Sequence, residues 1–397
     1  MELKDKVTDI SNSIYKELLE IRRHLHANPE LSLLEHNTAS YIVSKLDAYG
    51  INYKKGIAKT GITAVIEGKN PNTKVVALRA DMDALPITET NNADYASKNP
   101  GVMHACGHDV HMACLLGAAK ILQELRNDFE GSIKLIFQPS EETYPGGAIM
   151  MIEEGILENP APQVVFGQHV FPGLEAGKVG VKPGKYMAST DEVYLVVKGK
   201  GGHAATPHLN IDPVVMASHI VIALQQIVSR YAKPYMPTVL SFGKITAEGR
   251  NNIIPNEVKL EGTIRTFNEE WRAEAHKKIG EIAKSIAKGM GGDCEVRIEK
   301  GYPFLVNDEN VTGFFKETAA EYLGSDNVKD LELAMTAEDF AYFSQRLPSC
   351  FYRLGIRNEE KGITSNLHTP TFDVDEASLK TGAGLMAYVA LKWLKEK

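Results

Sequence analysis

The sequence contains few cysteines and no long hydrophobic run. Among its 397 residues, Cys106, Cys114, Cys294 and Cys350 are the only cysteines, and their irregular spacing makes a poor disulfide framework. No stretch approaches the roughly 18 uninterrupted apolar residues that would cross a bilayer. Residues 1–26 are charged and helix-patterned, without the apolar core and cleavage site of a secretory signal. We therefore expect a cytoplasmic protein that does not bind membranes.

An excess of basic residues is also missing. The chain has 44 Lys and Arg against 51 Asp and Glu, mixed along its length, for a formal net charge of −7. Nucleic-acid binding needs a basic patch, so nucleic acid is an unexpected partner. The hydrophobic fraction of 43% and charged fraction of 24% are ordinary for a globular protein. The length exceeds one hydrophobic core and favours two domains.

Strand and helix patterns alternate over the first 180 residues. Residues 62–67, 74–80, 132–137 and 163–168 have the composition of buried strands, and residues 12–28, 35–49 and 109–126 have helical periodicity. Strands interleaved with amphipathic helices predict an α/β domain with a mainly parallel sheet. Catalytic groups of such domains tend to lie at the carboxyl ends of the strands.

A different order of elements begins near residue 186. The patterns follow the order βαββαβ, which is typical of a ferredoxin-like unit. Gly- and Pro-containing stretches flank this unit and indicate two hinges. We interpret residues 186–300 as an insertion into one α/β domain, which is formed by residues 1–185 and 301–397. The predicted elements of the insertion are strands 191–199, 237–247, 256–267 and 294–300 and helices 212–230 and 269–290.

The stretch MHACGHDVHMA concentrates possible metal ligands within residues 103–113. A zinc finger is excluded, because Cys106 has no closely spaced cysteine partner. A thiol nucleophile with His108 or His111 as its base is possible, although no third member of such a relay is recognisable. His108 and His111 could also be ordinary residues in the first turn of the predicted helix, without a chemical role. Taken alone, the stretch leaves these alternatives open.

Polar side chains follow three of the predicted strands. Adjacent acids at the end of an apolar strand are costly unless a cation compensates them. Thiolate, imidazole and carboxylate together suit zinc or a similar divalent ion, and more than four ligands suggest two ions that share one. One of two neighbouring glutamates could then bind metal while the other acts as general base. The side chains at the strand ends are Asp81, Asp83, Glu141, Glu142 and His169.

A series of motifs resembles the M20 metallopeptidase family, specifically its amidohydrolase branch. This branch contains hippurate hydrolases, N-acyl-amino-acid amidohydrolases and auxin-conjugate hydrolases. The resemblance implies a metallopeptidase-like α/β catalytic domain with an inserted ferredoxin-like lid and dimerisation domain. It also implies a homodimer or higher homo-oligomer and two divalent metal ions, which could be zinc, manganese, nickel or cobalt. From about residue 20 to 395, the motifs are RRHLHANPELSLLE, LRADMDALP, MHACGHDVHMA, FQPSEE, GQHV, KGKGGHAATPH, NIIPNEV, MTAEDFAYF and LHTPTFDVDE.

The resemblance also assigns roles to single residues. Cys106 would bridge the metals, Glu141 would be the general base, and Asp83 would orient a metal-bound imidazole. The wider family often has a ligand histidine at the position of Asp81. The amidohydrolase branch lacks that histidine, and His108 supplies the ligand instead, so Asp81 is not counted among the metal ligands. His104 and His111 would support the ligands. The ligands besides Cys106 would be His108, Glu142, His169 and His368.

The inserted domain carries three further candidates. His203 and Asn252 resemble residues that hold the scissile carbonyl, and in dimeric relatives these come from the opposite subunit, but both could also be simple turn residues. Arg265 could pair with a substrate carboxylate or lie in a surface ion pair. The implied reaction is metal-dependent hydrolysis of N-acetyl, benzoyl or indole-acetyl amino acids. A dipeptidase or carboxypeptidase on the same metal site and a non-catalytic scaffold are the alternatives.

Overall fold

The computed structural model of the chain describes residues 2–396, which form two compact units. The second unit comprises Lys185–Leu305 and Leu333–Glu338, and the rest of the described chain forms the first. This division differs from the predicted boundaries, which gave all of residues 301–397 to the catalytic domain. The reason is a pair of backbone hydrogen bonds, from Ala334 N to Tyr186 O (2.9 Å) and from Ala188 N to Ala334 O (3.1 Å), which tie the late segment to the second unit.

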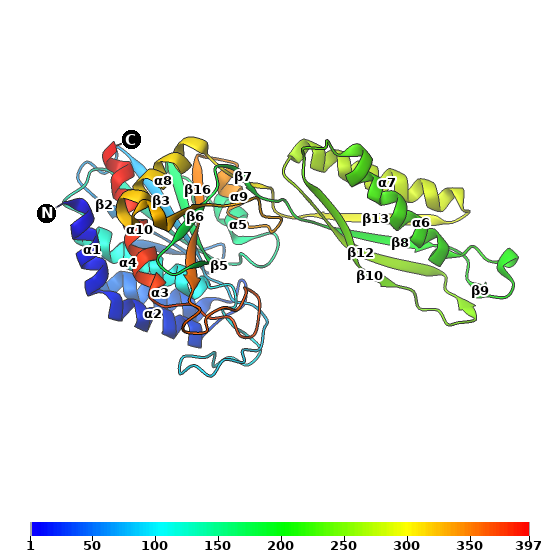
Figure 1. The fold of residues 1–397 in the computed structure, drawn as a ribbon, viewed down its shortest axis with the longest axis horizontal. Coiled ribbons are helices and arrows are strands. Elements are labelled where there is room, and N and C mark those ends of the chain that lie inside the picture. The colour runs from blue at the N-terminus through cyan, green and yellow to red at the C-terminus, as the bar shows by residue number, and fades with distance from the viewer. Residues whose placement is uncertain (1, 397) are drawn as a thin grey trace. The chain divides into compact units, whose positions relative to one another are not determined.

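The first unit is built on an eight-stranded mixed sheet (Figure 1), in the order β1-β2-β4-β3-β5-β16-β6-β15. The central strands β4, β3, β5 and β16 run parallel, as the sequence predicts, whereas β1, β2 and β6 make antiparallel pairs at the flanks. The strands are β1 (Tyr53–Ile57), β2 (Gly61–Glu67), β3 (Val75–Asp81), β4 (Ser132–Gln138), β5 (Val164–Glu175), β6 (Val179–Val181), β15 (Val328–Asp330) and β16 (Ser349–Arg357).

Helices cover this sheet, and α4 and α10 pack against each other and against its central strands. Both helices are almost wholly buried, which explains why their apolar residues are not confined to one face. The single predicted helix 12–28 is in fact two helices, broken at Ile14. The helices are α1 (Leu3–Ser13), α2 (Tyr15–Ala27), α3 (His36–Ala48), α4 (His108–Glu124), α5 (Gly147–Glu153), α8 (Glu309–Leu323), α9 (Ala341–Ser344) and α10 (Ser378–Glu396).

The second unit confirms the predicted ferredoxin-like architecture. Its antiparallel sheet has the order β10-β12-β8-β13, and α6 and α7 lie on one face of it (Figure 1). Val193, Leu195 and Val197 alternate with outward residues along β8 and face a core of their own beneath the helices. The main elements are β8 (Asp191–Lys198), α6 (Pro213–Gln226), β10 (Thr238–Thr246), β12 (Glu257–Thr266), α7 (Glu269–Gly289) and β13 (Asp293–Lys300).

Smaller elements complete the second unit. A two-stranded ribbon of β9 (Gly202–His203) and β11 (Ile253–Ile254) lies at one end of its sheet. Within the described residues, Pro213–Tyr231 is the one helical segment whose length and composition alone would allow it to cross a membrane. Its residues Met216, Ile220 and Leu224 are nevertheless buried in the core of the second unit, as in a helix of a globular domain.

Candidate active site

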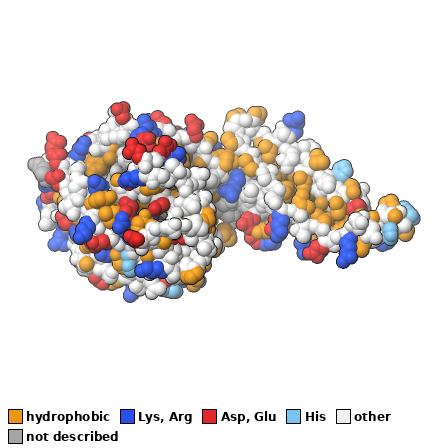
Figure 2. Space-filling model, turned by 60° about the horizontal axis from the view of Figure 1, so that its bottom comes forward, with side chains coloured by type: hydrophobic (Ala, Val, Ile, Leu, Met, Phe, Trp, Pro, Cys, Tyr) orange, Lys and Arg blue, Asp and Glu red, His pale blue; other side chains and the backbone are white. Residues whose placement is uncertain are grey.

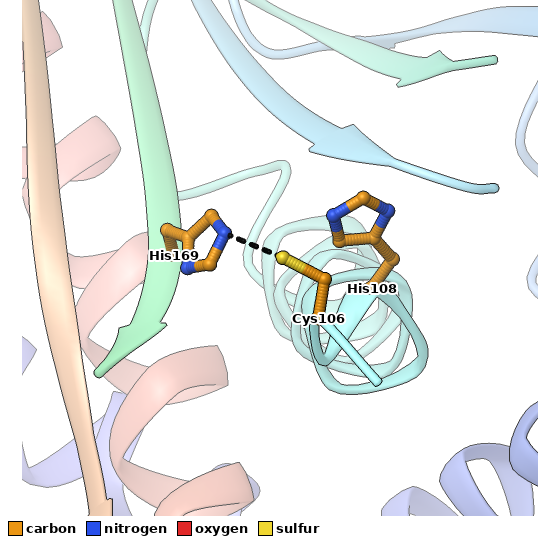
Figure 3. A group of neighbouring side chains, drawn as sticks. All are labelled: Cys106, His108 and His169. Carbon is orange, nitrogen blue, oxygen red and sulfur yellow. Dashed lines mark hydrogen bonds between the residues drawn. The ribbon is translucent and has the colours of Figure 1, made fainter. Parts of the chain in front are cut away.

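The loop before α4 brings a thiol and an imidazole beside the middle of β5. His169 lies within this strand and not after its end, where the sequence predicted it. Figure 3 shows Cys106 and His108 at the start of α4, with the ring of His169 reaching toward the sulfur from β5. Cys106 Sγ lies 3.3 Å from His169 Nε2. Gly107 between the two loop residues has a φ of +80°, and a Cβ there would lie 2.5 Å from Val170 Cγ2. Only glycine therefore allows α4 to start this close to β5.

The two imidazoles are each fixed by a backbone carbonyl. His108 Nδ1 donates to Asp83 O (2.8 Å), and His169 Nδ1 donates to Val170 O (2.7 Å). The Nε2 atom of each ring is therefore the one that points into the site. Burial and the positive charge of Arg353 lower the pKa of His169, which keeps this imidazole neutral. A neutral ring with a free Nε2 lone pair is the form that binds a metal.

His108 lies among carboxylates. Its Nε2 is 3.7 Å from Asp81 Oδ2 and 3.9 Å from Glu142 Oε1. Burial disfavours the charged ring, but the carboxylates of Asp81, Asp83 and Glu142 outweigh burial and raise the pKa of His108 to about 10. The pocket therefore attracts positive charge, which a proton or a metal cation can provide.

His368 joins the site from the far end of the chain. Its Nε2 lies 3.4 Å from Cys106 Sγ and 3.3 Å from Glu142 Oε1, and its backbone N–H donates to Ala105 O (2.8 Å). Among the groups of close ligand atoms in the described residues, two contain Cys106, one with His108 and His169 and the other with Glu142 and His368. Cys106 belongs to both groups, which is the arrangement expected of a ligand shared by two ions.

The donor atoms fit a divalent cation. His108 Nε2 and Glu142 Oε1 are buried without a hydrogen bond within the described part of the chain. Each such atom costs about 1–3 kcal/mol unless something compensates it. Burial and the charges of Glu142 and Glu141 raise the pKa of the Cys106 thiol, so a cation is needed to hold it as a thiolate. Thiolate, imidazole and carboxylate ligands suit zinc and its neighbours among the transition metals.

Asp83 holds the backbone that carries the paired glutamates. Its Oδ1 accepts from Glu141 N (2.9 Å), and its Oδ2 accepts from Glu142 N (3.0 Å) and Ser32 Oγ (2.6 Å). The ring of His108 is held by the main-chain oxygen of Asp83, with the carboxylate 3.4 Å away. Both the main-chain oxygen and the carboxylate of Asp83 therefore face the His108 ring, and the carboxylate also holds the amides of the two glutamates. The role of Asp83 in orienting a metal-bound imidazole stays a prediction.

The structure gives His111 a supporting position. His111 Nδ1 donates to Asp81 Oδ1 (2.5 Å), and its Nε2 accepts from Val170 N (2.8 Å), so both ring nitrogens are used. Asp81 also accepts from Arg79 Nη1 (2.7 Å). His104 is buried, and burial lowers its pKa to about 4. His111 does lie in another group of close ligand atoms, with Asp81 and His108, but its two ring nitrogens are already hydrogen-bonded to Asp81 and Val170. His104 is in none of the groups found among the described residues.

The sequence interpretation missed a buried polar cluster on the sheet. Arg79 donates from Nε to Gln138 Oε1 and from Nη2 to Asp339 Oδ1, both at 2.8 Å. Asp339 Oδ2 also accepts from Ala148 N (3.0 Å) in the first turn of α5. The only signal in the sequence was a charged residue inside the apolar strand KVVALRA.

The three candidates of the inserted domain lie in the second unit. His203 is exposed on β9 and pairs with Ile253 of β11, and Asn252 O accepts from Ala204 N (3.0 Å), so the two residues are neighbours. Arg265 on β12 donates from Nε to Thr263 Oγ1 (3.3 Å) and makes no salt bridge with any described residue. Burial lowers the pKa of Arg265. The surface ion pair considered for Arg265 is therefore absent from the described chain.

Known proteins resemble the chain over most of its length. Residues 77–392 match the family described as Peptidase family M20/M25/M40. The chain is 42% identical over 304 residues to an N-acyl-L-amino acid amidohydrolase of Geobacillus stearothermophilus, covering 77% of this chain and 81% of that protein. It is 39% identical over 397 residues to thermostable carboxypeptidase 2 of Saccharolobus solfataricus, covering 99% of each. A solved structure of a Bacillus subtilis protein, described as a dinuclear metal binding peptidase of the M20 family, matches with a TM-score of 0.84 at 33% identity, covering 97% of this chain and 99% of that one.

Proposed function

Because the chain belongs to the peptidase family M20/M25/M40 and is therefore a hydrolase, we propose that it cleaves the amide bond of N-acyl-amino acids. The products are a carboxylic acid and a free amino acid. The observation that carries this proposal is the position of Glu141, whose carboxylate lies within 4.8 Å of ligand atoms of His108 and Glu142. A general base must lie this close to the water and the scissile bond that it serves.

The proposed cofactor is a pair of divalent ions, drawn from zinc, manganese, nickel and cobalt. Cys106 would be common to both ions, in keeping with its place in the two groups of close ligand atoms. The dinuclear metal binding of the Bacillus subtilis relative supports the number of ions. When bound, such ions supply a Lewis acid that polarises the carbonyl and lowers the pKa of the attacking water. The other proposed ligands are His108, Glu142, His169 and His368.

The side chains of the protein then divide the work. Glu141 accepts the proton of the water and delivers it to the leaving amine, while Asp83 keeps the Glu141 backbone in place. His203 and Asn252 would stabilise the oxyanion of the tetrahedral intermediate, from the same subunit or from a partner. Arg265, which makes no salt bridge among the described residues, would pair with the carboxylate of the amino-acid product.

The test of the proposed base is Glu141→Gln. We expect turnover to fall by at least about 10²-fold, because the amide cannot accept the proton, while the metal content stays at the parent value. Elemental analysis and single-turnover kinetics measure the two quantities. Turnover close to that of the parent would show that another group is the base.

A carboxypeptidase or dipeptidase on the same metal site is the second candidate, because one of the relatives is named a carboxypeptidase. A panel of N-acetyl, N-benzoyl and indole-acetyl amino acids, set against dipeptides and N-blocked peptides, separates the two. The proposal requires the highest kcat/KM on an N-acyl-amino acid. A preference for peptides would make the chain a peptidase with the same chemistry.

The second unit is proposed to be a lid and dimerisation domain of a cytoplasmic homodimer. Helix α6 exposes Val214, Val215 and Ile222, with 40%, 45% and 70% of their surfaces accessible. Several large apolar side chains exposed on one helix are in keeping with a protein interface at that helix. Acidic and basic side chains are interspersed over the face of the first unit seen in Figure 2, in keeping with a small-molecule substrate and not with nucleic acid.

A further inference from the structure

A buried carboxylate outside the proposed ligand set contacts the loop that carries the base. Glu35 lies just before α3 and is fully buried, and its Oε1 accepts from Ser140 N (2.9 Å). We propose that Glu35 is a positioning residue, which fixes the backbone at Ser140 and thereby the direction in which Glu141 projects. This inference rests on the proposed role of Glu141 as general base.

Ser140 has a backbone conformation that needs support. Its φ of +53° lies in the left-handed region, which is disfavoured for any residue with a side chain. Its carbonyl accepts from Gly147 N (2.8 Å), where a Cβ would lie 1.7 Å from Pro139 O, so the chain is closely packed on this side. The N–H of Ser140 has Glu35 as its partner, and its hydroxyl donates to Thr143 O (3.3 Å). The turn therefore depends on Glu35 for one of the two hydrogen bonds that the backbone of Ser140 makes.

Glu35 does not have the usual task of a residue at its position. It is the N-cap of α3, yet its side chain makes no cap hydrogen bond to that helix. Glu30 takes this task instead, because its carboxylate accepts from Asn37 N (3.2 Å) and Thr38 N (2.8 Å). The second oxygen of Glu35 accepts from Thr60 Oγ1 (2.6 Å), which orients the carboxylate toward Ser140.

Two carboxylates thus hold three consecutive amides of the glutamate loop. Ser140 N donates to Glu35, and the amides of Glu141 and Glu142 donate to Asp83. Burial and the nearby charge of Asp83 raise the pKa of Glu35. Since burial disfavours the charge of Glu35, what the loop needs from it is a hydrogen-bond acceptor of the right length.

The experiment compares Glu35→Leu, Glu35→Asp and Glu35→Gln in the metal-loaded enzyme. Leu removes the oxygen that accepts from Ser140 N. Asp keeps a carboxylate, but its side chain is one methylene shorter, so the oxygen lies farther from Ser140 N. Both variants should lower kcat by about 10- to 100-fold, the range expected when a reacting group shifts by about 1 Å, and should change KM little. Gln should stay within about threefold of the parent, because its oxygen can accept from Ser140 N and its amide can donate to Thr60.

Hydrogen exchange gives a readout that does not depend on activity. In the metal-free protein, the peptide spanning residues 138–147 should exchange faster in Glu35→Leu and Glu35→Asp than in the parent and in Glu35→Gln. Glu30→Leu is the matched control, because it makes the same chemical change in a carboxylate that holds α3. It should raise exchange in the first turn of α3, while it lowers kcat and loosens the 138–147 peptide much less than Glu35→Leu does.

The outcomes separate this inference from the proposed function. If the parent fails to hydrolyse N-acyl-amino acids, the proposed function fails whatever the Glu35 variants do. If the parent is active and Glu35→Asp keeps its kcat and its exchange pattern, Glu35 is not a positioning residue. The same holds if Glu30→Leu lowers kcat as much as Glu35→Leu. If Glu35→Leu does not fold, the comparison of Glu35→Asp with Glu35→Gln alone decides.

Discussion

Cys106 is the residue whose chemistry changes most between the two interpretations of its loop. A nucleophilic cysteine needs a lowered thiol pKa, but burial and the neighbouring glutamates raise the pKa of Cys106. Its sulfur lies between His169 Nε2 and His368 Nε2, at 3.3 and 3.4 Å. These contacts favour a metal ligand over a covalent nucleophile.

Cys106→Ser should therefore weaken metal binding. A serine hydroxyl keeps its proton at neutral pH, so the site loses the negative charge shared by both ligand groups. We expect the dissociation constant of the metal to rise by at least about 10-fold. Removal of a residue that only hydrogen-bonds to a metal ligand already lowers metal affinity by about 10-fold or more, and Cys106 is proposed as a ligand itself. Competition with a coloured chelator measures this change. Cys106→Asp, which restores a negative charge, should recover most of the affinity, and equal affinity of Ser and Cys would contradict a bridging role.

At the level of single residues, the sequence points more directly to the proposed ligands than to the residues that hold their loops in place. Glu141 and Glu142 follow the apolar strand β4 and His169 follows the apolar stretch Val164–Gly167 within β5, and the parallel pairing of β4, β3 and β5 brings these positions to one region of the sheet. Glu35 gives no comparable signal, because its partner Ser140 is 105 positions away and contributes only a backbone N–H. Any residue except proline has a backbone N–H, so the identity of residue 140 does not reveal its contact with Glu35.

Helices α2 and α4 are joined by a buried ion cluster next to the site. Arg22 Nε donates to Asp109 Oδ2 (2.9 Å), and His26 links the same oxygen (Nδ1, 2.8 Å) to Glu89 Oε1 (Nε2, 3.1 Å). Asp109 directly follows His108 in α4. The cluster therefore anchors the end of the helix that carries a proposed ligand.

His26 should make the stability of this cluster depend on pH. Burial disfavours its charged form, but Asp109 and Glu89 outweigh burial and raise its pKa above the value of about 6.5 in the unfolded chain. The stabilisation by protonated His26 is then complete below about pH 6.5 and is lost as pH rises through the folded pKa. His26→Gln should cost about 1–3 kcal/mol in the free energy of unfolding at acidic pH and less at alkaline pH.

Urea unfolding of the parent and His26→Gln over a series of pH values measures this difference. His24→Gln is the control, because His24 lies in the same last turn of α2 but stacks on Tyr41, and burial lowers its pKa. For His24→Gln, the free energy of unfolding should not fall further below that of the parent as the pH becomes more acidic. A difference for His26→Gln that stays constant with pH would mean that the ring is held in its neutral form.

Among the secondary-structure elements, those with internal patterns were predictable. Helices α3, α4 and α7 fall within two residues of the predicted ranges, and Asn268 caps α7 by accepting from Trp271 N (2.7 Å). The edge strand β1 escaped prediction because its sequence YKKGI has no apolar alternation. The place of β16 between β5 and β6 was equally invisible, because strand pairing is decided by contacts between segments far apart in sequence.

The whole molecule has two separate hydrophobic cores, one in each unit. Val193 and Ile220 belong to the core of the second unit, whereas all five proposed metal ligands lie in the first. Units with their own cores can unfold in separate transitions. A metal that binds only the folded first unit should therefore stabilise that unit and leave the other unchanged.

Removal of metal should then lower one of two thermal transitions. At a free metal concentration of about 1,000 times its dissociation constant, binding contributes about 4 kcal/mol, and a chelator should lower the midpoint of the first unit by roughly 10 °C. Calorimetry with and without the chelator measures the shift. Leu135→Ala, in the core of the first unit, and Ile220→Ala, in the core of the second, identify the transitions, because each side chain is fully buried. If the chelator lowers the transition that Ile220→Ala also lowers, the second unit takes part in metal binding, and the proposed ligand set is incomplete.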